Sequence, residues 1–352
     1  MNKPSKVLIS VIVIILLVIV WFVAHETKKQ ASKTPINIGV IAPLTGAFAD
    51  YGENVKAGVQ AGLAAAGVGT STNIGVVYAD EQCDPKVAVS AYQKLTAIDG
   101  VKFIVGPGCG SPQEAIVPLL AQDGVVVIVP SAASADLSQK SGGNFFNIQY
   151  SLEDESKFNA EQIYAMNHKN VAIITYANAF SKTHHDSFVK NFKGTVVSDQ
   201  VVQEENADIL PYLTKIKAAK PDAIYAPDIA FFFAGATAKL KQLKMGSIPV
   251  FTTYVAELPS VIPVVEGVTY SFPANLDEEG ATTTSVGRGA VYELSKQAAE
   301  TLVPIVLSCG DEPLCVKGKL SSSGTFDGNG VYKRGMILKK IVGGVPVVLN
   351  TK

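Results

Sequence analysis

The sequence has no block of basic residues and no interleaving of basic with aromatic side chains, the patterns that track a nucleic-acid backbone. Its 352 residues include 30 Lys and Arg against 31 Asp and Glu, so the formal net charge is -1. With 47% hydrophobic and 17% charged residues, the composition is neither disordered nor fibrous. The chain is therefore not expected to bind nucleic acid, and it is long enough for two hydrophobic cores.

The sequence also lacks the patterns that carry hydrolytic or nucleotide chemistry. The adjacent histidines His184 and His185 stand in no G-x-S-x-G or H-E-x-x-H frame, and we expect them on the solvated face of a helix. The glycines around Cys109 lack the lysine of a phosphate-binding loop. A calcium-loop start at Asp327 fails because position twelve is Leu338 instead of glutamate. We predict a protein that is not an enzyme and uses no metal or cofactor.

One long apolar run is present. It covers residues 7–24, with lysines on both sides. Its eighteen residues are enough to span a bilayer, so we predict an uncleaved membrane anchor within residues 1–34. A cleaved signal peptide is the alternative, although Phe22 before Ala24 makes a poor cleavage site. No cysteine follows the run, which argues against lipid attachment by the usual cysteine route.

All four cysteines lie beyond this run, and an even count suits an oxidising compartment. Pairing neighbours gives the disulfides Cys83–Cys109 and Cys309–Cys315. In the chain-entropy model the first disulfide contributes about 3 to 4 kcal/mol to stability. Metal binding is the rival use of these cysteines, but no C-x-x-C pair or nearby histidine completes a zinc site.

Short apolar runs alternate with helical patterns along the rest of the chain. The run 125–129 is almost entirely β-branched, as in a parallel strand covered on both faces. A long helix at 287–307 and a hairpin around Gly343 and Gly344 end the pattern. Two series of strands predict two parallel α/β sheets with helices on both faces. The series are 36–41, 74–78, 101–105 and 125–129, then 171–176, 195–202, 223–226 and 249–254.

A glycine-rich turn at 106–110 follows the third expected strand and leads into a helix. Ser111, Pro112 and Glu114 have the order of an N-cap, a first helical residue and a capping box. Free amides at the positive end of a helix favour an anion such as a carboxylate. The turn predicts a ligand cradle, and an ordinary strand-to-helix turn with a capping serine is the alternative.

Ligands of doubly wound sheets meet the carboxyl ends of the strands. This rule selects turns from both series of strands, so we expect one site that takes residues from both sheets. The turns contain Gly110 and Ser111, residues 131–134, residues 176–180, Asp228 and Tyr254.

Several segments together form a specific pattern: 38–46 with Tyr51 and Gly52, 83–85, 104–106 with Cys109, 130–132 with Asp136 and Leu137, and 324–330. In these segments the sequence resembles the leucine/isoleucine/valine type of periplasmic binding protein, class I of the ligand-binding proteins of ABC importers. The resemblance implies two hinged lobes that close over a ligand, with three crossings near Tyr150, Phe272 and Phe326. Lobe 1 would comprise 35–149 with 274–325, and lobe 2 would comprise 150–273 with 326–352.

The resemblance also implies a site for an amino acid or a similar small carboxylate between the lobes. Gly110 and Ala133 stand where leucine-binding members place hydroxyl groups against the α-carboxylate, with serines next to both. The expected contacts from lobe 1 are Tyr51, Cys109, Gly110, Ser111, Ala132, Ala133 and Ser134.

A buried ammonium group needs a carboxylate or carbonyl partner. Asp228 is the first candidate because it follows a strand end, although it would equally begin the next helix. Glu257 is the second candidate, and Phe231 would line the pocket or belong to the core. The expected contacts from lobe 2 are Phe180, Asp228, Phe231, Tyr254 and Glu257.

The expected function is an extracytoplasmic solute-binding protein of an ABC importer, anchored by one N-terminal helix. Its partners would be a small-molecule ligand and the permease subunits in the membrane, and the protein itself would be monomeric. A membrane-anchored sensor of the same fold, without a transport role, is the alternative.

Overall fold

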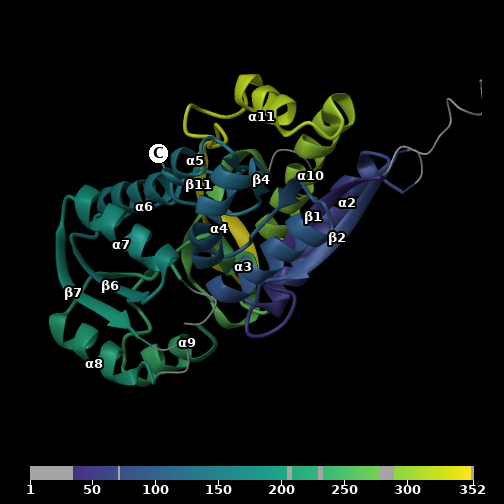
Figure 1. The fold of residues 1–352 in the computed structure, drawn as a ribbon. Helices are drawn as coiled ribbons and strands as arrows, with labels where there is room; N and C mark the ends of the chain where they lie inside the picture. Colours follow the sequence, from purple (N-terminus) through teal and green to yellow (C-terminus); the bar gives the residue numbers. More distant parts are fainter. Residues whose placement is uncertain (1–34, 70–71, 204–207, 229–232, 277–288, 350–352) are drawn as a thin grey trace, which may run out of the picture.

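The structure is a computed structural model that describes residues 35–69, 72–203, 208–228, 233–276 and 289–349 (Figure 1). The predicted anchor at 7–24 and the predicted contact Phe231 lie outside these ranges. Within them, no helix combines the length and the apolar character that a membrane crossing requires.

The first sheet is wholly parallel. In the described residues it has five strands in the order β2-β1-β3-β4-β5. The strands are β1 (Ile36–Ala42), β2 (Ile74–Asp80), β3 (Phe103–Val105), β4 (Val126–Val129) and β5 (Phe145–Asn147).

Helices cover both faces of this sheet. On β3, Phe103 and Val105 join the core cluster of α2 (Ala49–Ala65) and α10 (Gly289–Cys309). Ile104 joins the cluster of α3 (Pro85–Gln93) and α4 (Gly110–Asp123). Alternate residues of a strand point to opposite faces, so an unbroken apolar run serves two layers of helices. A turn of π-helix at Lys94–Ile98 extends α3, and the short α5 (Leu137–Lys140) and α11 (Pro313–Ser322) complete this half.

The second sheet has seven strands in the described residues, in the order β12-β11-β10-β9-β8-β6-β7. Five are parallel: β6 (Asn170–Tyr176), β7 (Thr195–Val202), β8 (Ala223–Tyr225), β9 (Val250–Thr252) and β10 (Thr269–Pro273). The hairpin β11 (Met336–Val342) and β12 (Val345–Leu349) is antiparallel, and its pairing confirms the predicted hairpin. The helices of this half are α6 (Leu152–Ala165), α7 (Ala179–Asn191), α8 (Leu210–Ala219) and α9 (Phe233–Gln242).

Two parallel α/β sheets were predicted, and the structure confirms them. Figure 1 shows α6, α7 and α8 grouped around β6 and β7 on one side, with α2 and α10 together on the other. The chain passes between the sheets three times: from β5 to α6, from β10 to α10, and from α11 to β11. The first and third passages lie together, because the Asn147 amide donates to the Gly330 carbonyl at 2.8 Å and the Tyr332 amide to the Asn147 carbonyl at 2.9 Å. These passages lie beside Tyr150, Phe272 and Phe326, the residues that the sequence predicts as hinges.

Candidate functional site

A cavity of about 130 Å³ lies between the two sheets, at the carboxyl ends of their strands. Its walls come from the start of α2, the β3–α4 turn, the end of β4, the β6–α7 turn, the loop after β8, and the 3₁₀ turn Tyr254–Glu257 after β9. The strand-end rule for doubly wound sheets therefore selects the region of this cavity. The lining residues are Phe48, Tyr51, Cys83, Gly108, Cys109, Gly110, Ser111, Pro112, Ser131, Ala132, Asn178, Phe180, Asp228, Tyr254, Val255 and Leu258.

Eight of the twelve predicted contacts lie on this lining, namely Tyr51, Cys109, Gly110, Ser111, Ala132, Phe180, Asp228 and Tyr254. Three others lie elsewhere. Ala133 is fully buried in the core. The Ser134 hydroxyl donates to Glu153 Oε1 at 2.6 Å. Glu257 is buried in an ion pair with Lys339 at 3.0 Å and accepts a hydrogen bond from the Tyr270 hydroxyl at 2.7 Å, so its charge is already matched away from the cavity.

Sequence reasoning missed half of the lining. Ser131 and Asn178 lie in turns that the strand-end rule selects, but nothing distinguished them from their neighbours there. Phe48 and Leu258 carried no local signal, because each reaches the cavity from a segment next to an expected element.

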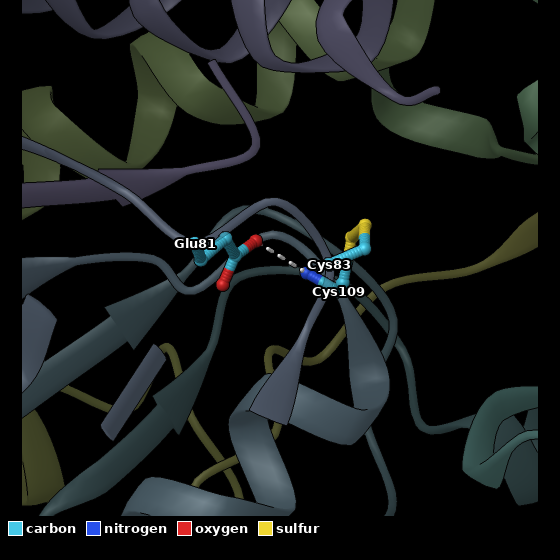
Figure 2. Close-up of side chains that lie close together, drawn as sticks. All are labelled: Glu81, Cys83 and Cys109. Atoms are coloured by element: carbon cyan, nitrogen blue, oxygen red, sulfur yellow. Dashed lines mark hydrogen bonds between the residues drawn. A yellow bond between two sulfur atoms is a disulfide. The ribbon is translucent and has the colours of Figure 1, made fainter. Parts of the chain in front are cut away.

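The amides of the β3–α4 turn are held by the chain itself. Glu81 is fully buried, and its Oε1 accepts hydrogen bonds from the amides of Gly108 at 3.0 Å and Cys109 at 3.1 Å. Figure 2 shows this carboxyl group beside the disulfide of Cys83 and Cys109. Burial raises the pKa of Glu81 to about 8. The sequence predicts free amides in this turn, and two of them instead donate to Glu81.

The predicted capping box at Ser111 is wrong as well. Helix α4 begins at Gly110, its N-cap is Cys109, and no side chain caps it. Ser111 is thus a residue of the first turn, where it lines the cavity. The sequence pattern misleads because α4 already begins at Gly110. The amide of its N-cap, Cys109, donates to Glu81, twenty-eight residues earlier, an acceptor that no local pattern shows.

Both predicted disulfides are present, Cys83–Cys109 and Cys309–Cys315. Glu81, Cys83 and Cys109 place their ligand atoms within 4.8 Å of one another, a spacing that would suit a metal ion. Both sulfurs belong to the disulfide, however, and a metal needs thiolates. This cluster is therefore a structural link between the β2–α3 loop and the wall of the cavity.

A family model described as periplasmic binding protein matches residues 35–286. The chain belongs to this family. A Leu/Ile/Val-binding protein of Rhizobium johnstonii is 29% identical over 210 residues, which are 58% of this chain and 57% of that protein. A Leu/Ile/Val-binding protein homolog of Brucella melitensis is 30% identical over 213 residues, 58% of each chain. The match spans less than two thirds of these relatives, and it confirms the resemblance to the leucine/isoleucine/valine type of binding protein.

Solved structures of periplasmic binding proteins share the fold. A leucine-binding protein from Thermotoga maritima gives a TM-score of 0.79 at 16% identity and covers 89% of this chain and 97% of its own. A solute-binding protein from R. palustris in complex with benzoate gives a TM-score of 0.77 at 19% identity and covers 90% of this chain and 95% of its own. A branched-chain amino acid binding protein from Streptococcus pneumoniae in complex with isoleucine gives a TM-score of 0.75 at 20% identity and covers 90% of this chain and 99% of its own. The two-lobe fold of these proteins is thus established for the chain.

In this binding protein the two lobes touch around the cavity. A Cβ atom added to Gly110 would lie 3.3 Å from Cβ of Phe180, so the start of α4 approaches the start of α7 too closely for a larger side chain. On the other rim, the Ser260 hydroxyl donates to Asp50 Oδ2 at 2.6 Å across the lobes.

Asp228 and two tyrosines belong to the polar part of the cavity, together with Ser111, Ser131 and Asn178. Asp228 Oδ2 accepts hydrogen bonds from Asn178 Nδ2 at 2.7 Å and from the Ser181 hydroxyl at 3.2 Å, which fixes the carboxylate at the start of α7. The Tyr51 hydroxyl donates to the Gly108 carbonyl at 3.2 Å. Burial raises the pKa of Tyr51 and of Tyr254 above the ordinary value, so both hydroxyls stay protonated.

A buried polar network lies behind the cavity. Glu155 Oε1 accepts hydrogen bonds from the hydroxyls of Tyr150 at 2.9 Å and Ser271 at 2.6 Å, two residues at the passages between the lobes. Its Oε2 faces Nε2 of His184 at 3.4 Å, and the His184 ring packs 4.6 Å from the Phe180 ring on the cavity wall. The network therefore joins the hinge region to the site.

His184 corrects the prediction of a solvated histidine pair. Its side chain is fully buried, whereas His185 is partly exposed. Burial lowers the pKa of His184 to about 3 and raises that of Glu155 to about 8. Near neutral pH both groups are uncharged, which is how this pair lies in the core without an unpaired ion.

Proposed function

We propose that this protein is an extracytoplasmic solute-binding protein of an ABC importer and captures an amino acid or a similar small carboxylate between its lobes. The observation that carries the proposal is the cavity at the strand ends of two sheets joined by three passages of chain. Relatives named as Leu/Ile/Val-binding proteins, and similar folds in complex with isoleucine or benzoate, support it.

The size of the cavity limits the ligand to one small solute. An engineered protein cavity of about 150 Å³ holds a benzene molecule, and this cavity has about 130 Å³. Such a space suits one amino acid side chain or one aromatic ring with a short polar group. The eight predicted residues on the lining, from Tyr51 to Tyr254, are the proposed contacts.

The proposal includes a hinge motion and a membrane partner. Lobes 35–149 with 274–325 and 150–273 with 326–352 would close by rotation at the three passages, and a ligand would shift the balance toward the closed form. The apolar run at 7–24 would hold the binding domain beside permease subunits on the extracytoplasmic side.

Titration calorimetry on the purified full-length chain tests this function. The twenty amino acids and a set of small aromatic and aliphatic carboxylates form the screen. We expect saturable binding of at least one of them at one site per chain, with a negative heat-capacity change from apolar burial. The function is wrong if no member of either class gives heat at any concentration up to the millimolar range.

The rim contact between Asp50 and Ser260 gives a further prediction. Asp50→Ala should weaken ligand binding about fivefold, because a hydrogen bond that forms only in the closed state contributes on the order of 1 kcal/mol. Small-angle scattering of the liganded variant should show a larger fraction of open molecules. Glu53→Ala is the control, since this exposed residue of the same helix forms an ion pair with its neighbour Lys56. Equal affinity of Asp50→Ala and the parent chain would show that this hydrogen bond does not stabilise the closed state.

A further inference from the structure

The cluster behind the cavity wall holds three groups that can coordinate a metal once its disulfide is open. Glu81, Cys83 and Cys109 each place one ligand atom within 4.8 Å of the others, as Figure 2 shows. In the described part of the chain, this is the one set of three acidic, cysteine or histidine side chains with such a spacing. While the two sulfurs are bonded to each other, they are not thiolates and do not bind a metal.

The carboxyl group of Glu81 is already oriented as a ligand. Its Oε1 accepts the amides of Gly108 at 3.0 Å and Cys109 at 3.1 Å, and the whole side chain is buried. Its Oε2 is buried as well, and it has no hydrogen-bond partner among the described residues. Hydrogen bonds to one part of a ligating group orient the rest of it and raise metal affinity. A buried oxygen without a partner is costly, and a cation bonded to it removes that cost.

The backbone holds both cysteines in place without the help of the disulfide. On the β2–α3 loop, the Glu81 amide donates to the Ala42 carbonyl at 3.1 Å, and the Asp84 amide donates to the Glu81 carbonyl at 2.8 Å. The Asp84 side chain also caps the start of α3. Cys109 is the N-cap of α4, and its carbonyl accepts the Gln113 amide at 3.1 Å. We therefore expect the two thiols of the reduced chain to stay beside Glu81.

We propose that reduction of the Cys83–Cys109 disulfide turns this cluster into a binding site for Zn²⁺, with Glu81, Cys83 and Cys109 as the ligands. A dithiol reductant supplies two electrons and two protons, so the disulfide breaks to two thiols while the sulfurs of the reductant form their own disulfide. The ion then displaces the two thiol protons, because thiolates are the ligands. The site goes beyond the proposed solute-binding function and does not depend on it.

Zinc suits this set of ligands. Its bonds are about 2.3 Å to thiolates and about 2.0 to 2.2 Å to carboxylates, so a tetrahedral site keeps its ligand atoms roughly 3.3 to 3.8 Å apart. The sulfurs reach this separation by side-chain rotation once they are no longer bonded. Magnesium and calcium prefer oxygen ligands alone. Three protein ligands leave a fourth position, and we expect it to face the cavity, because Cys83 and Cys109 both line the cavity.

A chain that keeps only this disulfide gives a clear test. The double substitution Cys309→Ser with Cys315→Ser removes the other disulfide. The full-length chain is reduced with dithiothreitol, desalted without oxygen and titrated with Cd²⁺, because Cd²⁺ bonded to thiolates absorbs in the ultraviolet. Competition by Zn²⁺ then measures the zinc affinity. We expect one ion per reduced chain, displaced by Zn²⁺, and no saturable absorption change in the oxidised chain.

Two variants assign the site to the named groups. Glu81→Gln keeps an oxygen for the two amides but replaces the second oxygen by an NH₂ group, which is a poor ligand. It should weaken metal binding at least about tenfold. Glu114→Gln changes an exposed carboxyl group of α4 and is the control that should leave the affinity unchanged. Cys83→Ser with Cys109→Ser, in a chain that keeps the second disulfide, should show no such site after reduction.

Thermal unfolding guards against a loss of structure on reduction. Zn²⁺ should raise the unfolding temperature of the reduced chain and have little effect on Glu81→Gln. The proposal is overturned if the reduced chain takes up no Cd²⁺, or if Glu81→Gln binds Cd²⁺ as tightly as its parent. It is overturned as well if the reduced chain is unfolded and Zn²⁺ does not restore its circular dichroism. No solute is present in these assays, so each outcome leaves the solute-binding function to its own screen.

Discussion

Gly58→Ala is expected to destabilise the protein by about 3 kcal/mol, against the usual direction of a glycine-to-alanine change within a helix. Gly58 lies on α2 where this helix packs on α10, and an added Cβ atom would be 2.2 Å from the Tyr292 carbonyl oxygen and 2.8 Å from Ser295 Cβ. The nearest atom belongs to the backbone, so no side-chain rotation relieves the contact. The helices must separate, and the core between them and the first sheet loses contact.

The matched control is Gly318→Ala on α11. Nothing lies within 4 Å of a Cβ atom placed on Gly318, so the change should stabilise the protein by about 0.5 to 1 kcal/mol through helix propensity. Urea unfolding of both variants beside the parent chain measures the difference. A stabilised Gly58→Ala would mean that α2 and α10 are packed less closely than the structure has them.

Raising the pH from 6.5 to 8 should lower the free energy of unfolding by on the order of 3 kcal/mol. Burial raises the pKa of both Glu81 and Glu155 to about 8. In this range both groups keep a proton in the folded state, whereas the unfolded chain has released it. Stability therefore falls with pH, by about 1.4 kcal/mol per pH unit for each group, until the folded-state pKa is passed.

The opposite sign applies to His184, whose pKa burial lowers to about 3. Below pH 6.5 His184 binds a proton in the unfolded chain but not in the folded chain. It therefore offsets part of the increase in the free energy of unfolding that Glu81 and Glu155 give as the pH falls. Above pH 6.5 the contribution of His184 to the pH dependence is small. Urea unfolding at pH 6.5, 7.25 and 8 measures how the free energy of unfolding changes with pH.

Glu155→Gln is the variant that tests the assignment. Glutamine imitates the protonated carboxyl group, accepts the hydrogen bonds of Tyr150 and Ser271, and does not titrate. The free energy of unfolding of this variant should change with pH about half as steeply as that of the parent chain, and the variant should be more stable than the parent chain at pH 8. His185→Gln is the control at a partly exposed site, and most of the slope should remain. A parent chain whose stability is constant from pH 6.5 to 8 would contradict the account.

Much of the fold was predictable because its signals are local. Each strand of the first sheet up to β4 is a short apolar run between turn residues, and α2 shows Val55, Val59 and Leu63 at helical spacing on the buried side. The terminal hairpin follows from two apolar runs around Gly343 and Gly344. Both disulfides follow from four cysteines in neighbouring pairs.

The missed elements have signals that depend on distant residues. Helix α6 gave no apolar stripe because Glu155, Ser156 and Asn159 face the core, where they find partners on other segments. Glu81 accepts the amides of Gly108 and Cys109, residues far along the chain, so no local pattern shows that these two donors are already bonded. A sequence pattern shows which groups are polar, but only the fold shows whether a polar group meets water, a ligand or another part of the chain.

The packing of α10 on α2 also sets the order in which the protein is completed during translation. Helix α2 ends at Ala65 and α10 begins at Gly289, so a ribosome that adds about 5 to 20 residues each second needs roughly 10 to 45 seconds to supply the partner. By then all the parallel strands of the second lobe, which end at Pro273, have been synthesised. For that interval the nascent first lobe leaves exposed the side of α2 at Gly58 and the part of the sheet that α10 will cover, and it is completed only when α10 has emerged.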